Sequence, residues 1–371
     1  MIQRIKIQNF KSLKNVSVDT RNLNVLMGLN GMGKSSFIQT LLILMQSDKL
    51  EDRTIDLIGI LAQIGQGRDA LYQFAEEEKI VFEITFKDYQ KFAWKFIYQK
   101  DKEKLKAESG YSGEHMKFFR EKTKRFQYIS AERIGPQEIY DASSVVVADK
   151  KQIGLLGEYA AYYINVFGSD FEVKKELRHF KATSYKLNSQ VNAWMQEISP
   201  GVSINTKYVP EVNKVILDYQ FDYGNQKTNP FKPKNVGFGI SYVLPIVLAL
   251  LTAEEGKIIV IENPESHIHP RGQAELGKLI SLAAATGAQI FVETHSDHIL
   301  NGIRVSVKEN STDMEKGISK DKVNVIYFDK ITTRKEQYTS LKEIEIDKNG
   351  TLSEYPKFFI DEWSNLLSKL I

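Results

Sequence analysis

Gly28-Leu29-Asn30-Gly31-Met32-Gly33-Lys34-Ser35 is the stretch that decides the fold. It satisfies the pattern G-x-x-x-x-G-K-[ST], and it lies between a predicted strand, Asn24 to Met27, and a predicted helix, Lys34 to Gln46. Glycines let backbone N–H groups close around phosphate oxygens, and the start of a helix adds a favourable potential. The alternative, an ordinary glycine turn entering a helix, is disfavoured because such a match arises by chance in roughly one chain per hundred of this length. The sequence therefore predicts a nucleotide-phosphate site.

Each polar residue of this loop has an expected role. Lys34 is expected to reach the β and γ phosphates, and Ser35 is expected to hold Mg²⁺. The predicted cofactors are therefore ATP and Mg²⁺. The predicted phosphate contacts are Asn30, Gly31, Gly33, Lys34, Ser35 and Ser36.

A second candidate element is an apolar run that ends in acidic residues. Ile258-Ile259-Val260-Ile261 precedes Glu262-Asn263-Pro264-Glu265, and a buried strand ending in a carboxylate is typical of a Walker B segment. We expect Glu262 to orient Mg²⁺. The alternative is that Glu262 and Glu265 only cap the helix that begins near Pro270, since acidic residues favour helix N-termini.

The next predicted strand ends in a histidine. Phe291-Val292-Glu293-Thr294-His295-Ser296 places an imidazole at the carboxyl edge of the same sheet, where α/β proteins bind ligands. We expect His295 to contact a γ-phosphate or to position water, although a lone histidine at a strand end is more often structural. His267 and His269 have the spacing of metal ligands, but a metal site is disfavoured because the chain has no cysteine.

The bulk composition bounds the class of protein. The chain has 371 residues, a net charge of +3 and no cysteine, so whole-chain charge does not point to nucleic acid and disulfides are excluded. The N-terminus lacks the apolar stretch of a signal peptide, and no apolar run is long enough to span a bilayer. We expect a cytoplasmic protein that does not act in a membrane.

The pattern of elements predicts an α/β fold. From residue 236 onward the order is helix, strand (257–261), helix (272–285), strand (289–293) and helix (297–305), which implies parallel strands with crossover helices. Polar and apolar residues alternate over 80–86 and 92–98, and again over 202–208 and 214–219, which predicts two hairpins. Further helices are expected at 156–167 and 190–198, and 308–322 is polar enough for an exposed loop.

The length favours one core interrupted by an inserted subdomain. The expected divisions are a first part of an ATPase head (1–49), an inserted basic and aromatic α+β subdomain (50–127), the remainder of the head (128–330) and a small C-terminal domain (331–371).

These elements in this order, with the opening Ile5-Lys6-Ile7-Gln8-Asn9-Phe10-Lys11-Ser12-Leu13, resemble the ATP-binding-cassette branch of ATPases that includes the SMC, RecF and OLD families. The segment 261–270 is especially similar to OLD-like ATPases of prokaryotes, many of which serve in anti-phage defence. The resemblance covers roughly 1–46 and 125–330, and residues 341–371 also resemble a small domain of unknown function. It implies a P-loop head with a mixed sheet flanked by helices, and it adds Lys11 to the expected nucleotide contacts.

In that superfamily a signature loop of one subunit closes on the γ-phosphate held by the other, which implies a homodimer that sandwiches ATP. The candidate here is Asn235-Val236-Gly237-Phe238-Gly239-Ile240-Ser241, at the start of an apolar helix. Gly239 and Ser241 are the expected contacts, because backbone N–H groups and a hydroxyl at a helix N-terminus suit an anion. A plain N-cap role for Ser241 is the alternative.

Two departures from the family pattern matter. The general base normally follows the Mg²⁺ carboxylate, and here that position holds Asn263, whose amide accepts no proton at neutral pH. Hydrolysis is therefore expected to be slow, with Glu265 as a candidate substitute base. OLD-type nucleases carry a nuclease domain after the head, whereas about 40 residues follow Asp329, so we expect a separate effector protein.

Residues 87–125 hold twelve Lys or Arg against six Asp or Glu, interleaved with Trp94, Tyr98, Tyr111 and Phe118. That combination suits phosphate contacts and base stacking, so nucleic acid is a possible partner. The favoured alternative is a solvated insertion whose aromatic rings form their own small core. Arg133 is expected either to reach a nucleotide phosphate or to pair with Glu132 or Glu158.

The leading hypothesis is an ATP-gated sensor or scaffold in a prokaryotic anti-phage complex, with Glu262, Asn263, Glu265 and His295 at the catalytic centre. The alternatives are a RecF-like DNA-repair ATPase, a transporter ATPase, and a structural module that binds ATP without hydrolysing it. DNA binding, a membrane subunit or the lack of turnover would distinguish them.

Overall fold

The structure of the chain is a computed structural model that describes residues 1–47, 54–88, 90–108, 125–355 and 368–369. It divides into two compact units. The first unit comprises Met1–Phe126, Val323–Ile346 and Leu352–Ile371, and the second comprises Gln127–Lys322 and Asp347–Thr351. Among the described residues, no helix is long and apolar enough to cross a membrane.

The first unit is built around an antiparallel sheet in the order β2-β1-β5-β6. Its inward positions alternate with polar ones, as a half-buried sheet requires: Ile80, Phe82, Ile84 and Phe86 are all buried. The predicted first hairpin is confirmed, and β5 also pairs with β1, so it joins the N-terminal strands in one sheet. The strands are β1 (Ile2–Phe10), β2 (Leu13–Asp19), β5 (Lys79–Phe86) and β6 (Lys91–Ile97), and the short elements β4 (Thr54–Asp56), α2 (Gly67–Ala70) and β7 (Lys104–Lys106) lie in the same unit.

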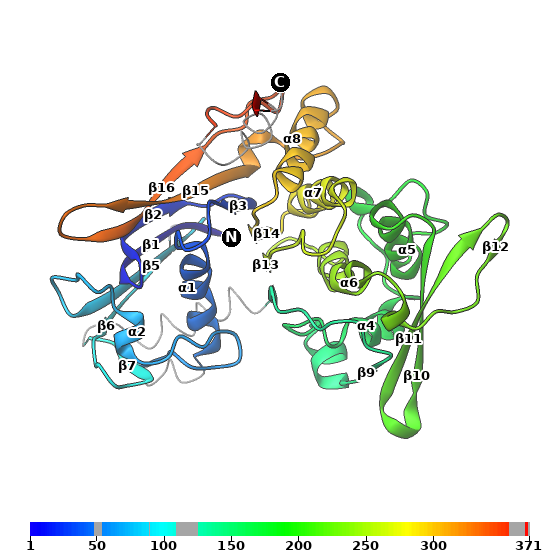
Figure 1. The fold of residues 1–371 in the computed structure, drawn as a ribbon, viewed down its shortest axis with the longest axis horizontal. Coiled ribbons are helices and arrows are strands. Elements are labelled where there is room, and N and C mark those ends of the chain that lie inside the picture. The colour runs from blue at the N-terminus through cyan, green and yellow to red at the C-terminus, as the bar shows by residue number, and fades with distance from the viewer. Residues whose placement is uncertain (48–53, 89, 109–124, 356–367, 370–371) are drawn as a thin grey trace. The chain divides into compact units, whose positions relative to one another are not determined.

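Three more strands of the first unit carry the P-loop. β3 (Leu23–Met27) pairs in parallel with β15 (Val323–Thr332), and β15 pairs antiparallel with β16 (Gln337–Ile344), so this sheet is mixed. All five residues of β3 are buried, and the loop that follows leads into α1 (Lys34–Gln46). The prediction for this helix is confirmed at both ends, and Figure 1 shows α1 and β3 in the blue part of the chain.

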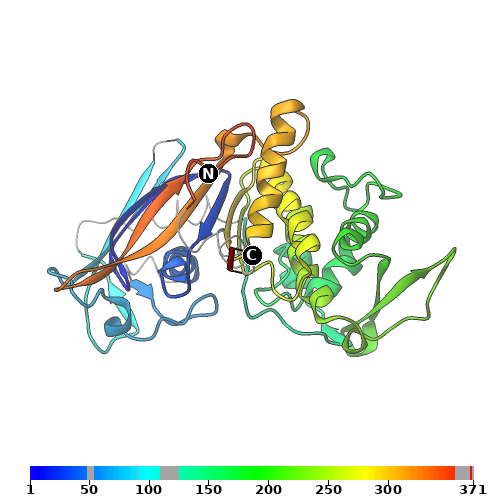
Figure 2. The same cartoon turned by 45° about the horizontal axis from the view of Figure 1, so that its top comes forward.

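The second unit contains the acidic strand and the histidine strand. β13 (Ile258–Glu262) and β14 (Gln289–Glu293) pair in parallel, with β8 (Phe126–Ile129) beside β13. The predicted strand at 289–293 is confirmed at both ends. Figures 1 and 2 show α7 (Pro270–Ala285) and α8 (Asp297–Thr312) lying side by side, as expected for crossover helices.

The rest of the second unit is a smaller α+β layer. The predicted second hairpin is confirmed as β10 (Val202–Val209) and β11 (Lys214–Tyr223), and β11 also pairs with β9 (Ile139–Asp141) and β12 (Gln226–Lys227). The helices are α4 (Ala160–Phe167), α5 (Leu187–Ile198) and α6 (Phe238–Leu251). The confirmed fold class is thus α/β, with a mixed sheet flanked by helices.

Two predictions at this level are corrected. The expected exposed loop at 308–322 begins as helix, because α8 continues to Thr312 with Ser306 and Val307 still buried. The helix expected from Leu156 starts at Ala160, after a turn in which Gly157 has a φ of 77°. The domain boundaries at 49/50, 127/128 and 330/331 stay a prediction.

Candidate nucleotide site

Two positions of the P-loop, Gly28 and Gly33, combine a positive φ with too little space for a Cβ atom. Gly28 has a φ of 136°, and a Cβ there would lie 2.2 Å from the Phe328 carbonyl oxygen. Gly33 has a φ of 102°, and a Cβ there would lie 2.4 Å from Thr339 Oγ1. The loop is therefore held between β3, α1 and the hairpin β15–β16, with its glycines fixed by sterics as well as by dihedral angle.

The polar groups of the loop are divided between an exposed rim and a buried lysine. Asn30, Gly31 and Ser35 are exposed, and Ser36 is half-buried. Lys34 is only 3% exposed, and its Nζ donates to the carbonyl oxygens of Gly28 and Leu29 at 2.8 and 2.9 Å. The first turn of α1 has no acidic residue and no side-chain cap, so the helix presents its N–H groups to an incoming anion.

Lys11 lies in the turn between β1 and β2 and contacts α1. Its Nζ donates to Gln39 Oε1 at 2.9 Å, and burial lowers the pKa of this ammonium from its ordinary value. Its backbone has a φ of 52°, a left-handed conformation that costs a non-glycine residue about 1–2 kcal/mol. Its predicted nucleotide contact stays a prediction.

Thr339 of β16 touches the P-loop, and sequence reasoning missed it. Its hydroxyl donates to the Met32 carbonyl oxygen at 2.9 Å and lies 2.8 Å from Ser12 Oγ, while its backbone N–H donates to the Ser12 carbonyl. Thr339 is 2% exposed. No local sequence pattern marks Thr339, because its contact with Ser12 joins residues that are 327 positions apart in the chain.

In the second unit, Glu262 is the last residue of β13 and is half-buried, whereas the four residues before it are buried. Its Oε2 accepts the Ala131 N–H at 3.3 Å, and the Tyr128 hydroxyl donates to the same carboxylate. Burial raises the pKa of the Glu262 carboxyl above its ordinary value, with those two hydrogen bonds and the Arg133 charge acting in the opposite direction. The carboxylate fits a hard cation such as Mg²⁺, which prefers oxygen ligands.

Arg133 binds main-chain carbonyls at the end of β13. Its guanidinium donates to the carbonyl oxygens of Ser130, Glu262 and Asn263 at 2.9, 2.7 and 2.7 Å, and the side chain is 2% exposed. Burial lowers the pKa of Arg133 to about 10. No hydrogen bond or ion pair to Glu132 or Glu158 is described for Arg133, and Glu158 instead accepts the Leu156 N–H.

Asn263 follows Glu262 in a left-handed conformation, with a φ of 43°. Its N–H donates to the Glu293 carbonyl at 2.9 Å, and its own carbonyl accepts from Arg133. Its side-chain Oδ1 is buried without a hydrogen-bond partner among the described residues. Asparagine tolerates this backbone region better than most residues, which gives a local reason for its presence here.

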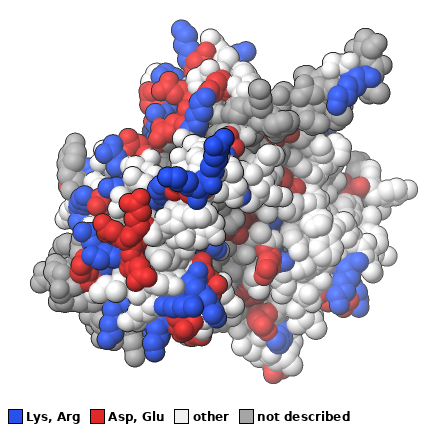
Figure 3. All heavy atoms as spheres, turned by 60° about the vertical axis from the view of Figure 1, so that its left-hand side comes forward, with Lys and Arg blue, Asp and Glu red and all other residues white. Residues whose placement is uncertain are grey.

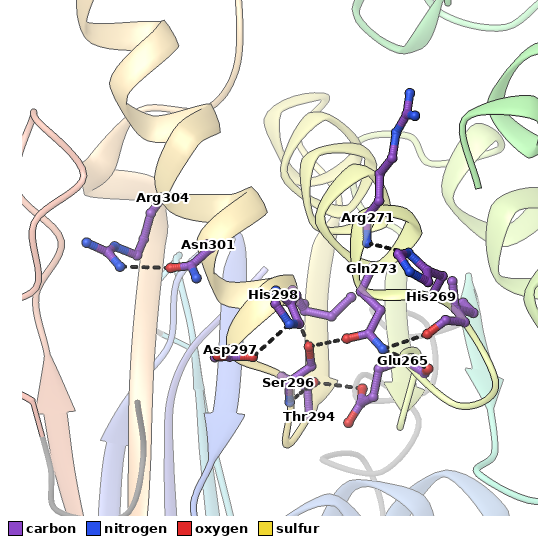
Figure 4. A network of polar contacts seen from close by, with 12 residues as sticks. Glu265, His269, Arg271, Gln273, Thr294, Ser296, Asp297, His298, Asn301 and Arg304 are labelled. Atoms are coloured by element: carbon purple, nitrogen blue, oxygen red, sulfur yellow. Dashed lines mark hydrogen bonds and ion pairs between the residues drawn. The ribbon is translucent and has the colours of Figure 1, made fainter. Parts of the chain in front are cut away.

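Figure 4 shows the contacts that join Glu265 to the end of β14. One carboxylate oxygen, Oε2, accepts the Thr294 hydroxyl at 2.7 Å, and the other, Oε1, accepts the His295 N–H at 2.8 Å. Glu265, which the sequence offered both as a helix cap and as a base, is thus bound to the segment that carries His295. His295 itself is exposed.

The start of α6 is more constrained than its sequence indicates. A Cβ on Gly239 would lie 2.1 Å from the His267 carbonyl oxygen, so glycine is required there by packing. Ser241 is buried, and its hydroxyl lies 3.1 Å from Tyr219 Oη. The N-cap role of Ser241 is wrong, because the N-cap of α6 is Gly237. The predicted phosphate contacts of Gly239 and Ser241 stay a prediction.

The histidines at 267 and 269 have other contacts. The His267 ring packs edge-on against Phe238 and Tyr242, and His269 Nδ1 accepts the Arg271 N–H at 3.3 Å. Within the described residues, no group of three or more His, Cys, Asp or Glu side chains is arranged to hold a metal ion.

The basic segment after residue 87 has an aromatic core of its own. Phe92, Trp94 and Phe96 are buried, so these rings are not available for stacking on a base. Two of its basic side chains pair with acids, Lys91 with Glu83 and Lys104 with Asp56, and its Glu108 pairs with Lys79. On the face drawn in Figure 3, blue and red side chains intermingle. Tyr111 and Phe118 lie outside the described residues.

Comparisons with known proteins agree with this geometry. Residues 23–301 match the model of the family described as "AAA domain, putative AbiEii toxin, Type IV TA system", and residues 318–370 match a model described as a protein of unknown function, DUF3696. No curated protein matches the chain.

Solved structures of SMC heads are similar in fold. The head of an SMC protein bound to the C-terminal winged-helix domain of ScpA has a TM-score of 0.50 at 11% identity, covering 94% of this chain and 98% of the other. The SMC head domain of Thermotoga maritima has a TM-score of 0.46 at 10% identity, covering 91% and 98%. A Pyrococcus furiosus SMC head with an extended coiled coil, bound to the C-terminal domain of ScpA, has a TM-score of 0.49 at 11% identity, covering 100% and 99%.

Proposed function

Because this chain belongs to the family described as "AAA domain, putative AbiEii toxin, Type IV TA system", we propose that it binds ATP with Mg²⁺ and hydrolyses it slowly. The observation that carries the proposal is the P-loop. Its glycines are fixed by the Phe328 carbonyl and Thr339, its lysine is buried against the loop, and the helix that follows begins without an acidic residue. This arrangement suits the phosphates of a nucleotide.

In the proposed reaction, Lys34 and the loop N–H groups bind the β and γ phosphates, while Ser35 and Glu262 hold Mg²⁺. Mg²⁺ held by these two residues would supply charge neutralisation to the transferred phosphoryl group. His295 would contact the γ-phosphate or the attacking water.

Slow turnover follows from the residue beside Glu262. The side chain of Asn263 cannot accept a proton at neutral pH, and its backbone is held by Glu293 and Arg133. We expect the wild-type rate to lie below the median enzyme rate of about 10 per second. Long-lived ATP binding suits a switch whose closed state persists.

We further propose that two copies close on two ATP molecules, with the start of α6 facing the nucleotide of the partner. The helix N-terminus is suited to an anion, and Phe238 beside it is exposed. A role in prokaryotic defence with a separate effector is supported by the family description, which refers to a toxin of a toxin–antitoxin system. Toxicity on co-expression with the products of neighbouring genes, lost in Lys34→Ala, tests this role.

The second candidate is a module that binds ATP without hydrolysing it. The amide of Asn263 accepts no proton at neutral pH, and each oxygen of Glu265 already accepts a hydrogen bond from the loop after β14, so both residues favour this reading. Single-turnover phosphate release decides between the two. Release that requires Mg²⁺ and is lost in Glu262→Gln supports hydrolysis, whereas tight ATP binding with no release contradicts it.

A further inference from the structure

Two loops of the second unit are joined by a pair of polar links. The first link is Glu265, in the loop after β13, which accepts hydrogen bonds from Thr294 and from the N–H of His295, after β14. Each carboxylate oxygen takes one donor, at 2.7 and 2.8 Å. Charge-assisted hydrogen bonds of this length are about twice as strong as neutral ones. The carboxylate therefore fixes the backbone at the residue that carries the imidazole.

The second link runs through Gln273 of α7. The Ser296 hydroxyl donates to Gln273 Oε1 at 2.6 Å, and Gln273 Nε2 donates to the Ile268 carbonyl at 2.8 Å. Ser296 is also the N-cap of α8, since its Oγ accepts the Ile299 N–H at 3.1 Å. Figure 4 shows both links, which run from the loop after β14 to Glu265 and to Gln273.

The two hydroxyl-bearing residues of these links are buried, whereas the bond from the His295 N–H to Glu265 is exposed. Thr294 is 0% exposed, and Ser296 is also buried, so water does not compete for their hydroxyl groups. The Ser296 N–H donates to Thr294 Oγ1 at 3.0 Å, which joins the two links into one network. His295, whose side chain is exposed, therefore lies between two residues, Thr294 and Ser296, that are both hydrogen-bonded to other parts of the unit.

We propose that Glu265 is a positioning residue for His295 and not the substitute general base. Each oxygen of Glu265 accepts a hydrogen bond from the neighbouring loop, and these two bonds orient the carboxylate toward the segment that carries the imidazole. The proposal rests on the proposed ATPase function, because His295 has a catalytic use only if ATP is hydrolysed. It assigns to Thr294, Glu265 and Gln273 the task of holding one imidazole at the carboxyl edge of the sheet.

Thr294→Val separates the two roles of Glu265. Valine keeps the shape of threonine and removes the hydroxyl donor, while the carboxylate remains. If Glu265 positions His295, single-turnover phosphate release falls about tenfold, as expected for one lost hydrogen bond of about 1.4 kcal/mol, and ATP affinity is unchanged. If Glu265 is the base, the released carboxylate keeps the rate at or above that of the wild type, which would overturn the proposal.

Glu265→Gln supplies a second comparison. The amide retains one acceptor oxygen, so a positioning role predicts a fall of about tenfold in the wild-type background and no further loss when Glu265→Gln is added to His295→Ala. A general base would cost about 10²- to 10⁴-fold and would remove the acid limb of the pH–rate profile. The matched control is Thr286→Val, which removes a hydroxyl bonded to the Ala283 carbonyl at the end of α7 and should leave the rate unchanged.

Hydrogen exchange reports on the link without nucleotide. The chain has six histidines, so the amide signals of ¹⁵N-histidine-labelled protein are few, and His295→Ala identifies the one of interest. We expect that amide to exchange at least tenfold faster in Glu265→Gln than in the wild type. An unchanged exchange rate of the His295 amide would show that Glu265 does not bind this N–H group. Absence of phosphate release by the wild type would instead overturn the proposed function, and with it the catalytic use of the link.

Discussion

Glu262 is half-buried and is also the predicted Mg²⁺ ligand, and these two properties favour opposite charge states of its carboxyl group. Burial raises its pKa because the charged form is poorly solvated. The folded state therefore holds this proton more tightly than the unfolded state, so the group favours folding at low pH, and this contribution is lost as the pH rises through the raised pKa. Mg²⁺ binding needs the anion, and is lost as the pH falls through the same pKa.

Glu262→Gln should separate these demands. We expect Mg²⁺-dependent turnover to fall at least about a hundredfold, since a bound metal supplies several kcal/mol of charge stabilisation. The free energy of unfolding at pH 8 should stay the same or rise, because an uncharged amide replaces a poorly solvated anion. Phosphate release and urea unfolding at pH 5 and pH 8 measure both effects. Equal turnover in the two proteins would show that Glu262 is not a metal ligand.

Asn263→Glu tests the reason for slow turnover. A carboxylate at this position should speed single-turnover phosphate release, because it can accept the proton of the attacking water. Its left-handed backbone should cost about 1 kcal/mol of stability for a glutamate. Asn263→Gln has the same size and the same backbone cost without the carboxylate, so it is the matched control. A rate that rises equally in both variants, or in neither, contradicts this explanation.

At the level of elements, the hairpin β15–β16 supports the P-loop. β15 pairs with β3, and Thr339 of β16 bonds the Met32 carbonyl. Thr339→Val keeps the shape and removes both hydroxyl contacts, so we expect about a tenfold weaker Kd for ATP, equivalent to one hydrogen bond. Thr332→Val, at the exposed end of the same hairpin, should bind as the wild type does. Calorimetric titration gives both values, and equal affinity in Thr339→Val would remove this role.

The elements themselves could largely be predicted from sequence, because periodicity and turn residues are local. The ends of the helix after the P-loop and of the strand before Thr294 agree with the sequence prediction. In both elements a glycine precedes a run of apolar residues, and both signals are local. The contacts of the candidate site could not be predicted in the same way. Arg133 binds main-chain carbonyls, which carry no signature in the sequence, and Ser241 turns to Tyr219 through the hairpin β10–β11.

At the scale of the whole molecule, the proposed dimer needs a test that leaves the fold intact. Gly239 is unsuitable because any side chain there meets the His267 carbonyl. Gly237 is the N-cap of α6, has a φ of −57°, and has open space where a Cβ would stand. Asp and Asn are both good N-cap residues, so the variants Gly237→Asp and Gly237→Asn differ from each other mainly in charge.

Gly237→Asp places a negative charge at the start of α6, where we propose that the γ-phosphate of the partner's ATP lies. We expect it to weaken ATP-driven dimerisation at least tenfold while ATP binding by the monomer is retained. Gly237→Asn should dimerise like the wild type. Sedimentation velocity with and without ATP, in a background that hydrolyses slowly, measures the dimer. Dimerisation of the Asp variant at the wild-type level would place the interface elsewhere.

The central claim is that the P-loop binds ATP, and calorimetric titration of Mg²⁺-ATP into the wild type and Lys34→Met tests it most directly. Methionine keeps the length of the buried stem and removes the charge that faces the β and γ phosphates. We predict saturable binding of one ATP per chain by the wild type, and at least about a hundredfold weaker binding by the variant, equivalent to about 3 kcal/mol. No binding by the wild type, or equal affinity in a folded Lys34→Met, would contradict the account.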